Sequence, residues 1–304
     1  MEWRQFVMHL GALPPDAVED VFVRHGAQAI TLCDAGDSPV LEPGPGETPL
    51  WNEVRITGLF PVSADLDELR RDLLQSFMLA RLPENHVEGL EDRAWEREWL
   101  KDFRPMQFGK RLWVCPGDFR VDARDAVVVR LDPGLAFGTG THPTTALCLE
   151  WLEGLDLEGR RVLDFGCGSG ILSIAALLLG AAAVTALDID PQAISASRSN
   201  AERNGVDTRL KTTLELTEFD AAYDVVVANV LATPLIRHAR TICERLVDGG
   251  AIALSGIFGS QAETVAEGYA DWIDFEPPAV RDSWARLSGS RIRQTGTPHV
   301  HTMP

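Results

Sequence analysis

The sequence has few cysteines, no long apolar run and a shortage of positive charge, and each shortage argues against a class of protein. The five cysteines are scattered and form no C-x-x-C pair, so neither a disulfide framework nor a metal site is expected. No stretch approaches the roughly 18 apolar residues of a membrane span. The N-terminus lacks the pattern of a secretory signal, so we expect a cytoplasmic protein without membrane contact.

Acidic residues outnumber basic ones, with 45 Asp and Glu against 28 Lys and Arg and a net charge of -17. Nucleic-acid binders place Lys and Arg against phosphates, so this imbalance argues against a nucleic-acid partner. The excess is concentrated in residues 1–90, which hold 15 acidic residues, 6 Arg and no Lys. A basic protein partner would fit this charge, and solubility alone explains it equally well.

The most informative segment joins an apolar strand that begins at Val162 to three glycines at alternate positions, 166, 168 and 170. Glycine adopts backbone dihedrals that are closed to other residues and lets a ligand lie against bare peptide groups. Apolar residues at helical spacing follow from Ile171, so strand, turn and helix predict the start of a doubly wound, Rossmann-like α/β domain. The spacing G-x-G-x-G differs from the G-x-G-x-x-G of dinucleotide enzymes.

A second apolar strand begins at Ala183 and ends in Asp188. A carboxylate at the end of the neighbouring strand can accept two hydrogen bonds from a ribose diol. The alternative is that Asp188 caps the helix that starts at Pro191, but Asp190 already fills that position. We therefore predict that Asp188 binds a ribose.

The segment from Leu131 to Thr145 combines flexible glycines with hydroxyls at the start of a predicted helix. Pro143 suits the first helical position, which places Thr144 and Thr145 among the free N–H groups of the first turn. Capping needs one hydroxyl, whereas the segment offers four, so we favour a lid over a ligand. His142 in this segment could relay a proton, and a capping or packing role explains it equally well.

Residues 1–90 predict a small ferredoxin-like α+β domain, because their elements follow the order β-α-β-β-α-β. No cluster of His, Cys or Ser with acidic residues suggests catalysis there, which leaves docking of a partner or structural support. The rest of the chain is expected to contain a linker helix and connecting strands at 91–130, the α/β domain at 131–292 and a disordered tail at 293–304. The linker helix carries Trp95 and Trp99 on one side.

Four segments together resemble the ribosomal protein L11 methyltransferases, the PrmA family. They are Gly134 to Thr145, Asp164 to Gly170, Asp188 to Ala193 and Asn229 to Leu231. The glycine turn alone fits any class I S-adenosylmethionine enzyme, whereas the threonine-rich segment joined to this N-terminal domain is more specific. The resemblance covers nearly the whole chain and ends at about Ile292.

The resemblance implies an enzyme that moves methyl groups from S-adenosylmethionine to lysine side chains and the N-terminal amine of ribosomal protein L11, leaving S-adenosylhomocysteine. The N-terminal domain would hold the basic substrate protein in its free or nearly free form, and the enzyme is expected to be a monomer. The donor would be bound by Phe137, Thr139, Thr145, Asp164, Gly166, Gly168, Asp188 and Asn229.

Asn229 is the expected catalytic residue, with His142 as a second candidate. The side-chain carbonyl of Asn229 can accept an N–H of the substrate amine and aim its lone pair, so no strong base is needed. The Val-Leu-Ala that follows differs from the Pro-Pro-aromatic sequence of adenine and glutamine methylases, which favours an aliphatic amine. The alternatives are methylation of another protein lysine or a small amine, and a non-enzymatic donor-binding module.

Overall fold

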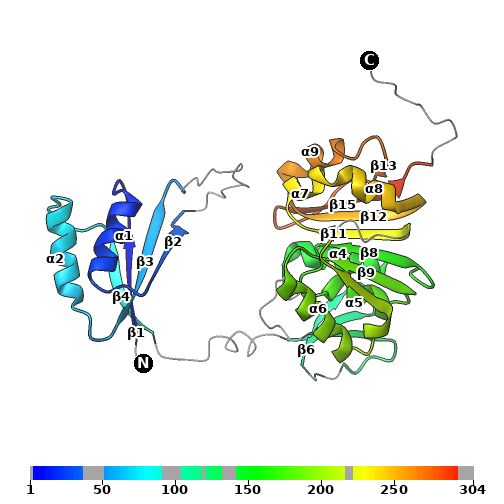
Figure 1. Ribbon diagram of the computed structural model, residues 1–304, viewed down its shortest axis with the longest axis horizontal. Helices are drawn as coiled ribbons and strands as arrows, with labels where there is room; N and C mark the ends of the chain where they lie inside the picture. The colour runs from blue at the N-terminus through cyan, green and yellow to red at the C-terminus, as the bar shows by residue number, and fades with distance from the viewer. Residues whose placement is uncertain are drawn as a thin grey trace, which may run out of the picture. The chain divides into compact units, whose positions relative to one another are not determined.

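The computed structural model describes residues 3–36, 51–90, 104–117, 119, 121–131, 142–215 and 222–293. The chain divides into two compact units, Met1–Glu98 and Trp99–Pro304, and each is described by itself (Figure 1). The predicted linker helix with its two tryptophans lies outside the described residues, as do the glycines of the threonine-rich segment and the tail after 293. Among the described residues, no helix is long and apolar enough to cross a membrane.

The first unit has the predicted ferredoxin-like order. Its four strands form one antiparallel sheet in the order β2-β3-β1-β4, so the first and third strands lie at the centre. The elements are β1 Trp3–His9, α1 Pro15–Arg24, β2 Ala29–Asp34, β3 Val54–Pro61, α2 Leu66–Ser76 and β4 Asn85–Leu90.

Both helices pack on one face of this sheet, because alternate residues of the strands and one stripe of each helix share a single core. Phe22 of α1 lies edge-on to Phe6 and Phe60, with each pair of ring centroids 5.7 Å apart. Gly58 leaves room for this cluster, since a Cβ there would lie 2.5 Å from the Phe22 ring. The core of the unit is therefore built around Phe22.

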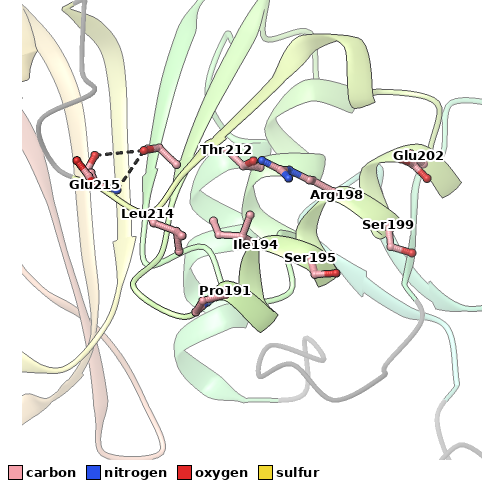
Figure 2. Close-up of a pocket in the computed structure, with 10 residues that line it drawn as sticks. Pro191, Ile194, Ser195, Arg198, Ser199, Glu202, Thr212, Leu214 and Glu215 are labelled. Carbon is pink, nitrogen blue, oxygen red and sulfur yellow. Dashed lines mark hydrogen bonds between the residues drawn. The ribbon is translucent and has the colours of Figure 1, made fainter.

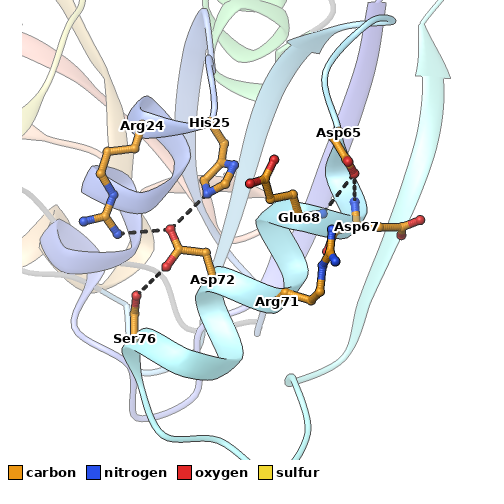
Figure 3. Close-up of polar contacts among 8 residues, drawn as sticks. All are labelled: Arg24, His25, Asp65, Asp67, Glu68, Arg71, Asp72 and Ser76. Atoms are coloured by element: carbon orange, nitrogen blue, oxygen red, sulfur yellow. Dashed lines mark hydrogen bonds and ion pairs between the residues drawn. The ribbon is translucent and has the colours of Figure 1, made fainter.

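A polar cluster joins the two helices at the surface of this unit (Figure 3). The Asp72 carboxylate on α2 lies 2.9 Å from His25 Nε2 and accepts a hydrogen bond from Ser76 Oγ at 2.9 Å and from Arg24 at 3.3 Å. The hydrogen bond from His25 is the main reason that the pKa of Asp72 is lowered from 3.8. The contribution of Asp72 to stability is therefore present above pH 3.8 and is lost as the pH falls through the lowered pKa.

Helix α2 ends in a Schellman motif with an unusual residue in it. Leu79 N donates to Leu74 O at 2.9 Å and Met78 N to Gln75 O at 3.3 Å. Met78 takes the left-handed position with φ of 51°, where glycine is preferred, and its side chain is 92% exposed.

We expect Met78→Gly to raise the free energy of unfolding by about 0.5–1 kcal/mol, because it removes the steric cost of that φ without losing a contact. Urea titration of the full chain measures the change. Met78→Ala, which keeps a Cβ, is the control and should bring no gain. Equal stability of the two variants would contradict the explanation.

The second unit contains a predominantly parallel sheet in the order β10-β9-β8-β11-β12-β15-β13, with β14 paired to β15. The first five strands run parallel, and β15 is antiparallel to β12. The strands are β8 Arg161–Phe165, β9 Ala183–Leu187, β10 Leu210–Thr213, β11 Tyr223–Asn229, β12 Leu246–Phe258, β13 Ile273–Phe275, β14 Ala279–Arg281 and β15 Trp284–Arg291.

This sheet is covered on both faces, as predicted for a doubly wound domain. Along β11, Val225 and Val227 belong to one core and Val226 and Ala228 to the other, because successive side chains point to opposite faces. Figure 1 shows α4 to α6 on one face and α7 to α9 on the other. The helices are α4 Pro143–Glu153, α5 Ile171–Leu178, α6 Pro191–Arg203, α7 Ala232–Arg237, α8 Ala239–Arg245 and α9 Ala262–Glu267.

Some segments of the second unit differ from the sequence-based expectation. The sequence periodicity predicts one helix over 234–246 and a strand over 251–255, whereas the structure has two short helices that meet at His238 and a longer strand β12. The strands β5 Met106–Phe108, β6 Leu112–Pro116 and β7 Val127–Leu131 form a separate small sheet. Phe108, Leu112 and Val129 of this sheet share a core with α4 and α5. We therefore assign these strands to the second unit, and the boundary near residue 131 stays a prediction.

Candidate functional site

The predicted site residues gather at the carboxyl ends of the parallel strands. The glycine turn follows β8, Asp188 follows β9 and Asn229 ends β11. Since β8 lies between β9 and β11, these three segments are neighbours at one edge of the sheet. Ligands of doubly wound domains bind at this edge.

The glycine turn has the backbone that the sequence predicted. Gly166, Gly168 and Gly170 have φ of 81°, 53° and 79°, all in the left-handed region. A Cβ on Gly166 would lie 2.1 Å from Val230 Cγ1, and one on Gly170 would lie 2.9 Å from Ser197 Oγ. The turn therefore requires glycine for its backbone conformation and for its close approach to two neighbouring segments.

Side chains of helix α6 form hydrogen bonds to the glycine turn. Ser197 Oγ donates to the carbonyl of Gly168, and Asn200 Nδ2 donates to that of Ser169, each at 2.9 Å. Cys167 in the turn is buried with its Sγ 3.3 Å from Ser197 Oγ, and burial raises the pKa of the thiol. Cys167 is therefore a packed thiol.

Asp164 lies beneath the turn and is fully buried. One carboxylate oxygen, Oδ2, accepts hydrogen bonds from Ser173 N at 3.0 Å and from Ser173 Oγ at 2.6 Å. The other, Oδ1, is buried and has no partner among the described residues. Burial is the main reason that the pKa of Asp164 is raised to about 7. An unpartnered buried oxygen next to a glycine turn suits a ligand that brings a hydrogen-bond donor.

Asp188 is tied to the turn through its carboxylate. Its Oδ2 accepts from Gly168 N at 2.9 Å, and its Oδ1 accepts from Asp190 N at 3.0 Å. Asp190 caps α6 by accepting from Gln192 N at 2.8 Å, as predicted, so Asp188 is not the helix cap. Because a carboxylate oxygen can accept two hydrogen bonds and each oxygen of Asp188 accepts one of these, Asp188 retains capacity for a diol.

Thr145 and Asn229 meet although they are 84 residues apart in sequence. Thr145 lies in the first turn of α4 and is buried, and its Oγ1 accepts a hydrogen bond from Asn229 Nδ2 at 3.3 Å. This bond engages one N–H of the amide, and among the described residues no donor is hydrogen-bonded to the carbonyl oxygen of Asn229. The predicted ligand residues Phe137 and Thr139, which precede α4, lie outside the described residues.

His142 caps α4. Its Nδ1 lies 2.7 Å from Thr144 Oγ1 and accepts from Thr144 N at 3.4 Å. The ring contacts Trp284 edge-on with centroids 4.7 Å apart, and Trp284 stacks on Phe258 at 4.1 Å. Burial lowers the pKa of His142, which favours the neutral ring that can accept these hydrogen bonds.

We expect His142→Ala to reduce the free energy of unfolding by about 1 kcal/mol, whereas His142→Asn, which can also cap, keeps it. The lowered pKa means that the unfolded chain takes up the proton first as the pH falls below 6.5. Stability is therefore lost as the pH falls through the folded pKa, and the Asn variant should lack this loss. Urea titrations at about pH 5 and about pH 8 measure it. If the free energy of unfolding had the same pH dependence in the wild type and in His142→Asn, the role of His142 as a neutral cap would be contradicted.

A groove of about 630 Å³ between α6 and the edge strand β10 extends the site (Figure 2). Asp188 N donates to Thr213 O at 3.2 Å, which brings the end of β10 next to the ribose-binding candidate. Ile189, which directly follows Asp188, is 90% exposed. This groove was not predicted from the sequence, and the apolar residue directly after Asp188 was the available signal. Its lining residues are Pro191, Ile194, Ser195, Arg198, Ser199, Glu202, Thr212, Thr213, Leu214 and Glu215.

Comparison with known proteins gives consistent matches over almost the full length. A family model described as ribosomal protein L11 methyltransferase (PrmA) matches residues 2–292. The chain is 49% identical over 292 residues to a ribosomal protein L11 methyltransferase of Pectobacterium carotovorum, covering 96% of this chain and 99% of the relative. It is 52% identical over 293 residues to that of Aeromonas hydrophila, covering 96% and 100%.

A similar solved structure supports the same likeness. The ribosomal protein L11 methylase of Lactobacillus delbrueckii subsp. bulgaricus has a TM-score of 0.59 and 31% sequence identity. The match covers 63% of this chain and 100% of that chain.

Proposed function

The chain belongs to the ribosomal protein L11 methyltransferase (PrmA) family, and from this premise we propose how its residues methylate amino groups of L11. The enzyme transfers methyl groups to ribosomal protein L11 and uses S-adenosylmethionine as the donor. The family match over residues 2–292 carries this conclusion. We propose that the acceptors are lysine side chains and the N-terminal amine.

The residues at the sheet edge fit the chemistry of the donor. Its ribose brings two hydroxyl donors, which suit the Asp188 carboxylate, and its amino group suits the unpartnered oxygen of Asp164. The left-handed turn at Gly166 and Gly168 exposes peptide groups against which a nucleoside can lie. We assign Thr145 and Asn229 to the same site because they meet beside this turn. Phe137 and Thr139 stay predicted ligands.

We further propose that Ile189 covers the purine of the donor. Its side chain is 90% exposed next to Asp188, and the groove lined by Leu214 and Glu215 begins at Pro191, two positions farther along the chain. Packing a planar base on this side chain would remove apolar surface from water. In this proposal the groove receives the adenine, and this part of the site was not predicted from the sequence.

When bound, the donor supplies an electrophilic methyl group on a sulfonium. The protein has to present an unprotonated amine in line with it. Desolvation lowers the pKa of an amine from its usual value near 10.4 for lysine, so a positioned acceptor suffices and no strong base is needed. Asn229 Oδ1 is that acceptor, because its amide nitrogen is held by Thr145. Proximity of oriented reactants then supplies most of the rate.

His142 was the second candidate for catalysis, as a proton relay. Its capping bonds to Thr144 and its lowered pKa support a structural role, with a neutral ring above pH 6.5. If His142 relays a proton, the methylation rate of His142→Ala should be lower than that of the wild type between about pH 7 and about pH 9. Parallel profiles over this range would exclude the relay.

The acidic N-terminal unit is proposed to hold the substrate protein. Ribosomal proteins are usually basic, and opposite charges speed encounter and orient partners. The preference for free or nearly free L11, the lack of a nucleic-acid partner, the monomeric state and the cytoplasmic location stay predictions of the sequence.

The decisive experiment is mass spectrometry of purified L11 after incubation with enzyme and S-adenosylmethionine. We expect peptides that carry added methyl groups on lysines and on the N-terminal amine, together with formation of S-adenosylhomocysteine. A reaction without enzyme is the control. Methyl groups only on carboxylates, amides or another protein would reject the amine assignment.

A further inference from the structure

Helix α4 carries Thr145 in its first turn, and a hairpin distant in sequence holds this helix. The hairpin consists of β14 and β15, joined at the residue pair Arg281 and Trp284 by Asp282 and Ser283. Both turn residues have positive φ, 48° and 69°, which is the geometry of a tight two-residue turn that follows the twist of the strands. The turn therefore fixes the register of the two strands on either side of it.

Arg281 forms the first polar contact from the hairpin to α4. Its guanidinium lies 3.0 Å from both carboxylate oxygens of Glu150, which is in the second half of α4. The two side chains are 40% and 34% exposed, so the pair is partly shielded from water. Both contacts come from Nη2 of Arg281, and they link the second half of α4 to the hairpin.

Arg286 forms the second contact, nearer to the site. Its Nη1 donates to the carbonyl of Leu147 in α4 at 2.7 Å. Arg286 pairs with Ser255 of β12, and Ser255 pairs with Asn229 of β11. Arg286 and Asn229 therefore lie in one row of paired residues across three strands. The hydrogen bond from Arg286 to Leu147 connects α4 to this row, which ends in the proposed catalytic amide of Asn229.

The position of Arg286 is unfavourable for the stability of the fold. Its Nε is buried without a partner among the described residues, and burial is the main cause of a lowered pKa. An unpaired buried polar atom destabilises a fold, and an apolar side chain would avoid that penalty. A charged donor kept at this position is consistent with a task other than stability.

We propose that Arg281 and Arg286 are positioning residues for methyl-donor binding, which act through α4 to hold Thr145 beside Asn229. Neither arginine contacts the proposed catalytic amide. Loss of either contact releases α4 from the sheet edge, which separates the two halves of the donor site. The proposal rests on the proposed function.

A charge exchange between positions 150 and 281 tests the proposal without relying on one variant that fails to fold. Arg281→Glu and Glu150→Arg each place like charges together, whereas the double variant restores an opposite pair. We expect each single change to raise the Kd for S-adenosylmethionine about five- to tenfold, and the double variant to return it to within about twofold of the wild type. Calorimetry at a temperature where every variant is folded measures the Kd.

Arg160→Ala is the matched control. Its ion pair with Asp224 has a separation of 3.4 Å and exposures of 52% and 28%, but it lies at the amino end of β8, away from the site. The Kd of Arg160→Ala for S-adenosylmethionine should equal that of the wild type. For Arg286, we expect Arg286→Lys to keep both the KM for the donor and kcat nearer to the wild type than Arg286→Ala, because release of α4 also releases the Thr145 hydrogen bond to Asn229.

The outcomes are distinct. Single variants with wild-type Kd, or a double variant no better than the singles, would overturn the positioning role. Equal loss of donor affinity in Arg160→Ala would also overturn it, because a general loss of stability would then explain the effect. If the wild type itself did not bind S-adenosylmethionine, the proposed function would fail instead.

Discussion

Replacing Asn229 with alanine is expected to lower kcat for L11 methylation about a hundredfold, with a much smaller change in the Kd for the donor. The reason is geometric. Thr145 Oγ1 accepts from the amide nitrogen at 3.3 Å, so in the proposed site the carbonyl oxygen of Asn229 is the atom that receives the amine. Without that acceptor, the amine can approach with its lone pair turned away from the methyl group. Single-turnover rates at saturating donor measure the effect on the chemical step.

Variants of Thr145 provide the control. Thr145→Ser keeps a hydroxyl that can hold the amide nitrogen, so most of the rate should remain. Thr145→Val has nearly the same shape but no acceptor, so the amide can rotate and the rate should fall, though less than in Asn229→Ala. A rate for Asn229→Ala within about twofold of the wild type would reject the orienting role.

The second large effect is expected at Asp188. Removing a carboxylate that accepts hydrogen bonds from a ribose diol costs about 1.5–3 kcal/mol, so Asp188→Ala should weaken donor binding at least about tenfold. The change also frees Gly168 N, which Asp188 now holds at 2.9 Å. Isothermal titration calorimetry with S-adenosylhomocysteine measures the affinity without turnover.

Asp190 offers a matched control only two positions away. Its carboxylate caps α6 through Gln192 N at 2.8 Å and has no assigned role with the donor. Asp190→Ala should therefore lower stability by about 1 kcal/mol while the donor affinity stays close to that of the wild type. Equal affinity in the two alanine variants, or no loss in Asp188→Ala, would remove the ribose assignment.

The glycine turn and the two aspartates after β9 were accessible from sequence because their signals are local. A triplet of glycines that all need positive φ, and a proline directly after an aspartate cap, depend on the conformation of a few adjacent residues. The β-α-β-β-α-β order of the first unit was equally local, since each helix and strand shows its own period.

Other features were not predicted from the sequence. The hairpin of β14 and β15 was not predicted, because its turn uses Asp282 and Ser283 at positive φ without the glycine or asparagine that usually marks such a turn. The groove beside β10 was also not predicted, because it forms only where α6 packs beside an edge strand of the sheet.

The sequence by itself therefore determined the two-part architecture, the glycine turn and the identity of the residues at the strand ends, because periodicity, glycine content and capping act over short spans of chain. Only the tertiary structure decided that Thr145 holds the amide of Asn229 and that Arg281 reaches Glu150 across 131 residues. These contacts follow from the order of strands in the sheet and from helix packing on its face, and neither is encoded in any single segment.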